Sequence, residues 1–327
     1  MFEQALLAMA SVATDPYLLF LIFVTTILGV VIGVLPGLGA TTGAALLLPF
    51  TLTMDPVHAI AVLATIYVSA TFAGSITAIL INTPGTSAAA ATTFDGYPLA
   101  QKGEAGRALG VAVISSTVGG VFSVIVLCFA APLLARVAYE FRSPEYFALT
   151  VFGLSMLASI SAGGAVKNLI GGIFGVWLST IGAERVTGIE RFMFGNYELY
   201  EGLHFVPIFI GLFAISELLV QSKTVNKIVN TVSMKAVKLP TKEDYKKIWK
   251  TILRSCGIGT FIGVLPAEGA TVASMIGYSE ARRWSKNKDE FGKGAIEGIA
   301  GAEAANNSAT GGAMVPTMVL GIPGSGT

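Results

Sequence analysis

Long runs of apolar residues alternate with short polar segments along the whole chain. Five of these runs approach the roughly 20 residues that a helix needs to cross a bilayer. They are residues 18–35, 108–135, 146–160, 165–181 and 204–220. Hydrophobic residues make up 53% of the chain and charged residues only 13%, about half of the roughly 25% usual in globular proteins. The sequence therefore predicts an all-α, polytopic membrane protein.

One ten-residue string occurs twice in the chain. IGVLPGLGAT at 32–41 and IGVLPAEGAT at 262–271 agree at eight of ten positions. Each copy is followed by the string SAT, at 69–71 and 308–310, and then by a Pro-Gly pair, at 84–85 and 323–324. Duplicated apolar segments interrupted by Gly and Pro are typical of secondary transporters and mark their substrate sites. The repeat predicts a transporter with a first core at 1–110 and a second core at 255–327.

Each copy of the string is expected to form a re-entrant hairpin, which enters and leaves the bilayer on one side. Basic residues flank the second copy at both ends, Arg254 before it and Arg282 after it. Arms of about a dozen residues, roughly 18 Å of helix, cannot cross ~30 Å of hydrocarbon. Pro and Gly interrupt the helix where such a hairpin turns. The predicted tip residues are Pro36, Gly37, Gly39 and Thr41 in the first hairpin, 18–53, and Pro266, Gly269 and Thr271 in the second.

The flanking charges predict that the two hairpins enter from opposite sides. Segment 222–254 is rich in Lys and Arg, which the positive-inside rule makes a cytoplasmic loop. The first hairpin lies between Asp15 and Asp55, and no Lys or Arg precedes Lys102. We expect five crossings in between, the broken helix 57–97 and four helices that fill residues 111–221. An odd number of membrane crossings between the two hairpins places them on opposite sides of the membrane, which makes the repeat an inverted one. A different division of this Gly- and Ala-rich region into helices would give an even number of crossings and hairpins on the same side.

The second core ends soon after its Pro-Gly pair, at Thr327, whereas about 140 residues follow the corresponding point of the first core. A chain end inside a membrane-embedded loop would leave backbone groups without hydrogen bonds. We therefore expect the chain to be C-terminally truncated and the second core to be incomplete.

The two Pro-Gly breaks are the predicted substrate site. A helix that restarts after a break presents unpaired N–H groups and a partial positive charge, which suit a carboxylate. Such breaks can also be kinks that only improve packing. Their occurrence in both copies favours a site. Its predicted residues are Asn82, Thr83, Gly85, Thr86 and Ser87 in the first copy and Gly321, Gly324 and Ser325 in the second.

Polar residues in the second copy are the candidates for coupling transport to Na⁺ or H⁺. Glu303, Asn307 and Thr310 follow the i, i+4, i+7 spacing of one helix face, with Asn306 beside them. Glu268 lies at the predicted hairpin tip. Carboxylates inside a membrane are costly and commonly mark ion or proton pathways. The alternative for such a residue is an interfacial helix cap, and for Glu303 the two interpretations are equally weighted.

Nothing in the sequence indicates an enzyme, a bound metal or a cofactor. HExxH, Walker and GxSxG motifs are all absent from the sequence. Two other classes stay open: a channel subunit with the same hairpins, and a membrane enzyme whose catalytic residues lie in the missing C-terminal part.

Three segments resemble the large membrane subunit of tripartite tricarboxylate transporters, the TctA family. They are GVLPGLGATTGAALLLPF at 33–50, GSITAILINTPGTSAAAATTFDGYPLAQKGEAGRALG at 74–110 and FGKGAIEGIAGAEAANNSATGGAMVPTMVLGIPGSGT at 291–327. The resemblance implies a permease of the bacterial inner membrane, with a small four-span membrane subunit and a periplasmic binding protein as partners. It also implies cation-driven uptake of a tricarboxylate or dicarboxylate, and no nucleic-acid partner. The family often has Pro-Gly where this chain has Pro266-Ala267.

Overall fold

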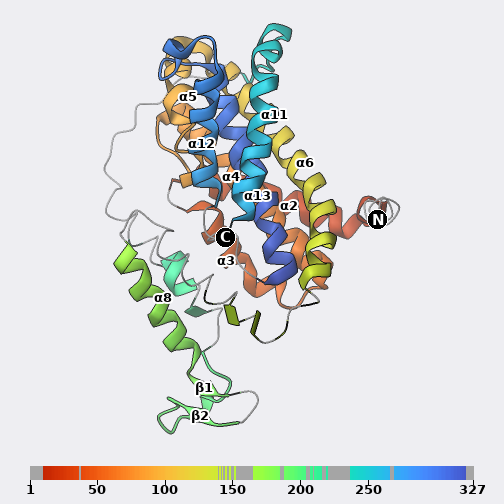
Figure 1. The fold of residues 1–327 in the computed structure, drawn as a ribbon, viewed down its shortest axis with the longest axis vertical. Helices are drawn as coiled ribbons and strands as arrows, with labels where there is room; N and C mark the ends of the chain where they lie inside the picture. Colours follow the sequence, from red (N-terminus) through yellow and green to blue (C-terminus); the bar gives the residue numbers. More distant parts are fainter. Residues whose placement is uncertain are drawn as a thin grey trace.

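The computed structural model describes residues 10–36, 38–138, 165–184, 188–203, 210–215, 236–265 and 269–321, with scattered positions at 140–151, 207, 208 and 219. Helices make up most of this part of the chain, as Figure 1 shows. The α-helices are α2 (Pro16–Val34), α3 (Gly39–Thr51), α4 (Pro56–Ile81), α5 (Thr93–Leu99), α6 (Ala105–Ala138), α8 (Ala165–Ser179), α11 (Lys242–Val264), α12 (Gly269–Trp284) and α13 (Ile296–Leu320). Shorter helical turns are η1 (Ser87–Ala89), η2 (Ala100–Glu104), η4 (Tyr197–Leu199), η5 (Ile210–Ile215) and η6 (Lys288–Glu290).

A small β-ladder departs from the all-helical prediction. Strands β1 (Gly182–Ala183) and β2 (Glu190–Arg191) pair antiparallel, Gly182 with Arg191 and Ala183 with Glu190. The ladder follows α8, away from the bundle of α4, α6, α11, α12 and α13 (Figure 1). The bundle that carries the repeated strings contains helices and connecting turns but no strand in its described residues.

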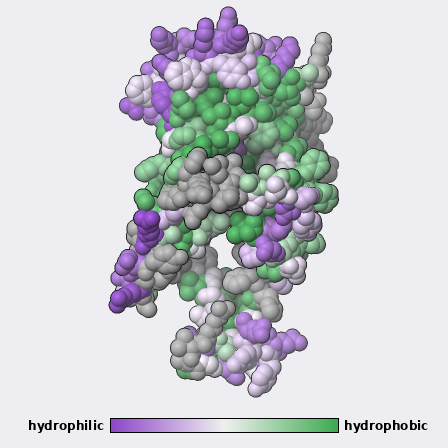
Figure 2. Space-filling model, turned by 90° about the vertical axis from the view of Figure 1, so that its right-hand side faces the viewer, coloured by the Kyte–Doolittle hydropathy of each residue, from purple (hydrophilic) through white to green (hydrophobic). Residues whose placement is uncertain are grey.

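Three described stretches are long and apolar enough to cross a membrane: Pro16–Val34, Pro56–Ile81 and Thr93–Arg136, which comprises α5, η2 and most of α6. The helices predicted at 18–35 and 108–135 are confirmed. The run at 165–181 is mostly α8, whereas the runs at 146–160 and 204–220 lie largely outside the described residues. On the face drawn in Figure 2, hydrophilic residues gather at one end of the molecule above a hydrophobic belt, as expected of a protein whose middle lies in lipid.

The repeated strings fold into the same three-helix motif in both copies. Aligned with the offsets of the sequence repeat, α2 and α11 end at equivalent residues, Val34 and Val264. The next helices, α3 and α12, begin at Gly39 and Gly269, whose positive φ angles are 57° and 58°. These two glycines hold the turns at the predicted hairpin tips, because L-residues rarely adopt that conformation.

The first helix of each hairpin packs on the third helix through equivalent glycines. A methyl group on Gly33 would overlap the carbonyl oxygen of Ala70, and one on Gly263 would overlap that of Ala309. One turn earlier, Gly29 and Gly259 pack in the same way against Ser69 and Ser308. Small residues that allow close helix contact are characteristic of membrane helix packing. The sequence repeat is therefore a repeat of tertiary contacts.

The third helices, α4 and α13, run in opposite directions. Tyr67, near the middle of α4, packs in one cluster with Ala313, near the end of α13. The chain after α4 leads to α5, where Asp95 binds backbone N–H groups at the start of α13. Each hairpin opens where its own third helix begins: His58 contacts Asp15 at one mouth, and Glu297 contacts Ser285 at the other. The two mouths therefore lie at opposite ends of the bundle.

The arms of the second hairpin are longer than the dozen residues predicted. α11 has 23 residues and begins at Lys242, inside the segment predicted as a basic loop at 222–254. A capping box explains this early start, since Thr241 and Asp244 satisfy each other's backbone N–H groups. The first turns of α11 are thus a helical extension of the hairpin into the polar end of the molecule.

Candidate functional site

The Pro-Gly break of the first copy folds back along α4. Helix α4 ends at Asn82, whose φ angle of 55° is left-handed. The N–H groups of Asn82 and Thr83 both donate to the carbonyl oxygen of Thr77, and that of Gly85 donates to Gly74 at 3.1 Å. A methyl group on Gly85 would overlap the carbonyl oxygen of Gly33. The N–H groups of three predicted substrate residues, Asn82, Thr83 and Gly85, are thus already used in backbone hydrogen bonds to α4.

Unpaired donors follow directly after this fold-back. The N–H groups of Thr86, Ser87 and Ala88, at the start of η1, donate no hydrogen bond to any described residue. The Thr86 hydroxyl is buried and has no partner in the described part of the chain. The Ser87 hydroxyl is exposed and lies 2.8 Å from that of Thr271, just beyond the tip of the second hairpin. The predicted break and the predicted tip therefore meet here.

The other predicted substrate and tip residues are only partly described. Gly321 ends α13 in the same left-handed conformation as Asn82, with a φ angle of 67°, and occupies the equivalent place in the repeat. Pro36, Gly39, Thr41, Gly269 and Thr271 lie in or beside the two turns. Gly37, Pro266, Glu268, Gly324 and Ser325 lie outside the described residues.

The carboxylate of Glu303 is completely buried in the middle of the bundle. Its Oε1 atom accepts hydrogen bonds from the Thr92 hydroxyl and, at 3.5 Å, from the Asn306 amide. Its Oε2 atom accepts one from the Ser116 hydroxyl of α6 at 2.8 Å. No Lys, Arg or His of the described chain pairs with it. It lies in the third turn of α13, so its side chain does not cap that helix.

The remaining polar residues of this helix face are buried beside Glu303. The Asn306 amide also donates to the carbonyl oxygen of Ala88 at 3.3 Å, next to the unpaired N–H groups. Asn307 donates to the Asn306 side chain at 2.5 Å and to the Glu303 carbonyl at 3.2 Å. Thr310 donates to the carbonyl of Asn307, so its hydroxyl serves its own helix. Glu303, Asn306 and Asn307 form one connected network, which reaches the Pro-Gly segment.

Sequence reasoning missed Thr92 and Ser116. Ser116 lies in a Ser-Ser pair inside the apolar run 108–135, and hydroxyls in such a run were a usable signal. Thr92 had no such signal, because its contact with Glu303 joins residues 211 positions apart. Only the tertiary fold brings these two side chains to the carboxylate.

A second buried carboxylate, that of Asp95, joins the two cores. Its Oδ1 atom accepts three backbone hydrogen bonds of 2.8 Å from Gly292, Gly294 and Ala295. These N–H groups precede α13, so Asp95 fixes α5 to the start of the second copy's third helix. All three donors reach Oδ1, whereas Oδ2 is buried and has no hydrogen-bond partner among the described residues. The bonds to Oδ1 make Asp95 a structural link between the two copies.

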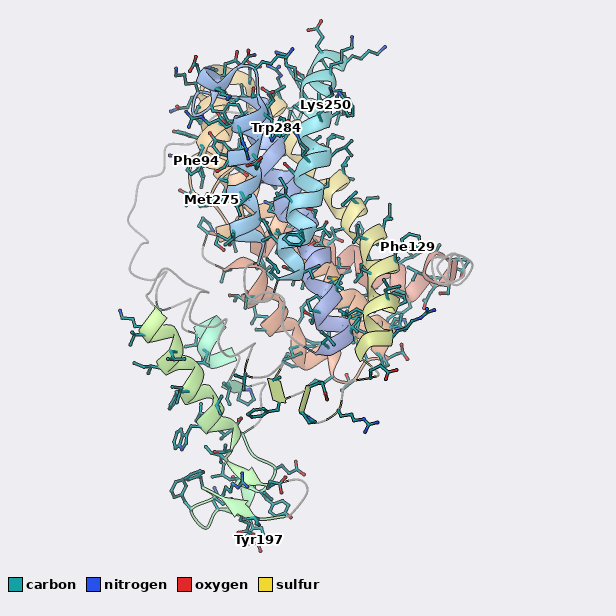
Figure 3. All side chains as sticks on the ribbon, in the orientation of Figure 1. Phe94, Phe129, Tyr197, Lys250, Met275 and Trp284 are labelled. Atoms are coloured by element: carbon teal, nitrogen blue, oxygen red, sulfur yellow. The ribbon has the colours of Figure 1, made fainter. Side chains whose placement is uncertain are left out.

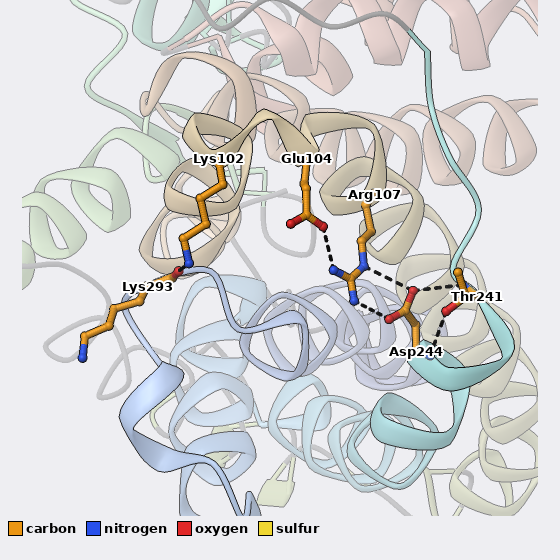
Figure 4. A network of polar contacts seen from close by, with 6 residues as sticks. All are labelled: Lys102, Glu104, Arg107, Thr241, Asp244 and Lys293. Atoms are coloured by element: carbon orange, nitrogen blue, oxygen red, sulfur yellow. Dashed lines mark hydrogen bonds and ion pairs between the residues drawn. The ribbon is translucent and has the colours of Figure 1, made fainter.

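At the polar end of the molecule, charged residues also connect α6 and η2 to the second copy of the repeat. Arg107 binds Asp244 through two hydrogen bonds, of 2.5 and 3.2 Å, and Glu104 at 2.6 Å (Figure 4). Lys102 donates to the carbonyl oxygen of Lys293 at 2.6 Å. The Arg107 guanidinium lowers the pKa of Asp244 to about 2. Nearby, Lys250 and Trp284 project from α11 and α12 (Figure 3), and Arg254 lies 5.1 Å over the Trp284 ring.

Basic side chains, aromatic rings and an apolar belt, together with the duplicated helical cores, define a multi-pass membrane protein. Residues 19–327 match the model of the tripartite tricarboxylate transporter TctA family, and the chain belongs to that family. This confirms the resemblance recognised in the sequence.

Two proteins of Agrobacterium vitis are similar to this chain. One, described as an uncharacterized 52.8 kDa protein in the TAR-I ttuC' 3' region, is 44% identical over 303 residues, 92% of this chain. The other, an uncharacterized protein in the TAR-II ttuC' 3' region, is 51% identical over 65 residues, 20% of this chain and 27% of its own length. The chain spans 60% of the length of the first relative. No solved structure matches it.

Proposed function

We propose that the protein is the large permease subunit of a tripartite transporter that takes up a carboxylate, driven by a cation gradient. The observation that carries this proposal is that one short segment connects N–H groups suited to an anion with a buried carboxylate suited to a cation. Residues 86–88 offer unpaired N–H groups, and the same segment contacts the buried network of Glu303. An anion site beside a cation-binding carboxylate is what symport of a carboxylate with a cation requires.

The substrate carboxylate binds the N–H groups of Thr86, Ser87 and Ala88 together with the Thr86 hydroxyl. Backbone donors at a helix start are effective anion ligands because several of them point at one place. No Lys or Arg occurs before Lys102, so the first copy has no basic side chain for this role. The equivalent residues Gly321, Gly324 and Ser325 complete the site from the second copy.

Alternating access comes from an inverted repeat. Support comes from the opposite directions of α4 and α13 and from hairpin mouths at opposite ends of the bundle. Arg282 and Arg283 lie in the last turn of α12, at the mouth of the second hairpin, whereas Asp15 and Asp55 lie at the mouth of the first. By the positive-inside rule the second mouth faces the cytoplasm. In this proposal both hairpins are re-entrant.

Membership of the TctA family supports the remaining parts of the proposal. The protein lies in the bacterial inner membrane, with a small membrane subunit beside it. A periplasmic binding protein delivers the substrate, a tricarboxylate or a dicarboxylate. The coupling cation, Na⁺ or H⁺, binds at Glu303 and its neighbours.

Uptake into proteoliposomes tests this function. The protein is reconstituted with its small subunit, the binding protein is added outside, and radiolabelled citrate and succinate are supplied with an inward Na⁺ or H⁺ gradient. The proposal expects saturable accumulation of one substrate above its external concentration, abolished when the gradient is collapsed. Equilibration without accumulation would identify a channel, and recovery of chemically altered substrate would identify an enzyme.

A further inference from the structure

One short segment, residues 86–92, lies between the two candidate sites. Its first residues carry the unpaired N–H groups, and its last residue, Thr92, donates a hydrogen bond to Glu303. Between them, the carbonyl oxygen of Ala88 accepts from Asn306. Ala88, Ala89, Ala91 and Thr92 are buried, so the segment is held on both sides by the bundle.

Among the described residues, no Lys, Arg or His forms an ion pair with Glu303. From α6 it faces the hydroxyl of Ser116, with the buried and unpartnered hydroxyl of Ser115 next along the helix. The other elements packed on α13 bring three titratable groups to this helix: Cys256 of α11, in one cluster with Ala304, and Tyr278 of α12 and Asp95 of α5, both beside Gly298. None of these three can compensate a carboxylate. An ionised side chain there is costly until a cation neutralises it.

The strength of the bond from Thr92 depends on the charge of Glu303. Hydrogen bonds to an ionised acceptor are roughly twice as strong as those between neutral groups. Ser116 has the same dependence, but it is fixed on α6, whereas Thr92 belongs to the segment that carries the anion donors. A change of charge at Glu303 therefore changes the strength of the hydrogen bond that fixes residues 86–92 to the bundle.

We propose that Glu303 and Ser116 form the site of the coupled monovalent cation, and that Thr92, which donates to Glu303, transmits its occupancy to the anion-binding end of residues 86–92. This inference rests on the proposed function, because it assigns the coupling step of that transport to particular side chains. Thr92 is a positioning residue. Neutralisation of Glu303 by the cation loosens the Thr92 bond and lets residues 86–88 reach the conformation that binds the carboxylate.

The test follows the segment itself and needs no substrate. Ser87→Cys is placed in a background that lacks Cys128 and Cys256, and its rate of labelling by a soluble maleimide is measured in detergent. One arm varies Na⁺ at constant pH and ionic strength, with K⁺ as the replacement. The other varies pH without Na⁺, and Asn287→Cys, exposed at the polar end, corrects for the changing thiolate fraction.

The arm in which labelling changes identifies the cation. We expect roughly a fivefold change in rate, which corresponds to the difference between a charged and a neutral hydrogen bond. Glu303→Gln, a neutral mimic, is expected to fix the rate at the cation-bound value. Thr92→Val is expected to remove the cation dependence, and Thr92→Ser to keep it. Thr93→Val is the matched control, because the Thr93 hydroxyl donates to Ala90 and not to Glu303.

Three results would overturn the inference. They are a parent protein whose labelling responds to neither cation, a Thr92→Val variant that responds like the parent, and a Thr93→Val variant that loses the response as Thr92→Val does. Because no carboxylate is present, a wrong assignment of the substrate leaves these measurements unaffected. Failure of the proposed function would instead appear as absent uptake alongside a normal labelling response.

Discussion

The two copies of the repeat share a backbone but differ in chemistry. In the second copy, α13 presents Glu303, Asn306 and Asn307 to the centre of the bundle; the equivalent positions of α4 are Ala64, Tyr67 and Val68. In the first copy, the residues after the break lie in the centre as well and supply unpaired N–H groups. The two copies thus share the same three-helix scaffold, but only the second copy carries the carboxylate network.

The mouths of the two hairpins also share a backbone arrangement but differ in their polar residues. His58 lies 3.2 Å from Asp15 and 3.4 Å from Asp55 at the first mouth. The equivalent of His58 in the second copy is Glu297, which accepts from the Ser285 hydroxyl near several Lys and Arg residues. Equivalent positions therefore carry different polar groups, a His among Asp residues and a Glu near basic residues, while the glycine contacts that shape each hairpin are unchanged. The comparison separates residues that make the fold from those that make the site.

The largest effect is expected from the shared glycines. Gly33→Ala and Gly263→Ala should each destabilise the protein by about 1 to 3 kcal/mol or more, since a methyl group meets a backbone carbonyl that cannot move easily. The matched control is Gly257→Ala in α11, where a methyl group meets nothing within 4 Å. Thermal denaturation in detergent, followed by size-exclusion chromatography, measures the stability. Tolerance at one glycine and not at the other would show that the two contacts are not equivalent.

The sidedness of the mouths should give an all-or-none difference. Single cysteines at Thr53 and Asn287, in a background without Cys128 and Cys256, are labelled with an impermeant thiol reagent in intact cells. Thr53→Cys should react from outside, and Asn287→Cys only after permeabilisation. Labelling of both from the same side would refute the inverted arrangement.

Thr86 distinguishes the anion site from a structural kink. Thr86→Ala removes one hydrogen bond to a charged group, worth ~1.5 to 3 kcal/mol, and should lower substrate affinity roughly 10- to 150-fold. Thr83→Ala is the control, because the Thr83 hydroxyl donates to the carbonyl of Ile81. Equilibrium binding of the transported carboxylate to purified protein provides the measurement. Equal affinities of both variants and the parent would place the anion elsewhere.

The smallest effect concerns the ion pair at the polar end. The lowered pKa of Asp244 means that its pair with Arg107 stabilises the fold fully above the unfolded-state pKa of about 4 and loses this contribution as the pH falls to about 2. Asp244→Asn should therefore cost about 1 kcal/mol at pH 7 and progressively less below pH 4. Melting temperatures at pH 7, 4 and 3 test this trend. A constant difference would mean that the loss is not electrostatic.

The sequence predicted most of what the repeat determines. Pro, Gly and apolar periodicity carried enough information for the turns at Gly39 and Gly269, for a helix break beside Pro84-Gly85, and for the shared face of Glu303 and Asn307. Whether that face is buried was left open by the sequence. It did not predict the early start of α11, because the capping box at Thr241 lies in a segment dominated by charge. It also did not predict that Gly85 packs on Gly33, or that Thr92 reaches Glu303, since those contacts depend on the relative placement of distant helices.

The most direct test of cation-coupled transport compares the parent with Glu303→Gln in proteoliposomes. Two quantities are measured: exchange of labelled for unlabelled carboxylate at equilibrium, and net accumulation under an inward cation gradient. The parent is expected to do both, whereas Glu303→Gln is expected to exchange substrate but accumulate none, because a permanently neutral side chain cannot bind and release the cation. Gradient-driven accumulation by Glu303→Gln equal to that of the parent would contradict this expectation.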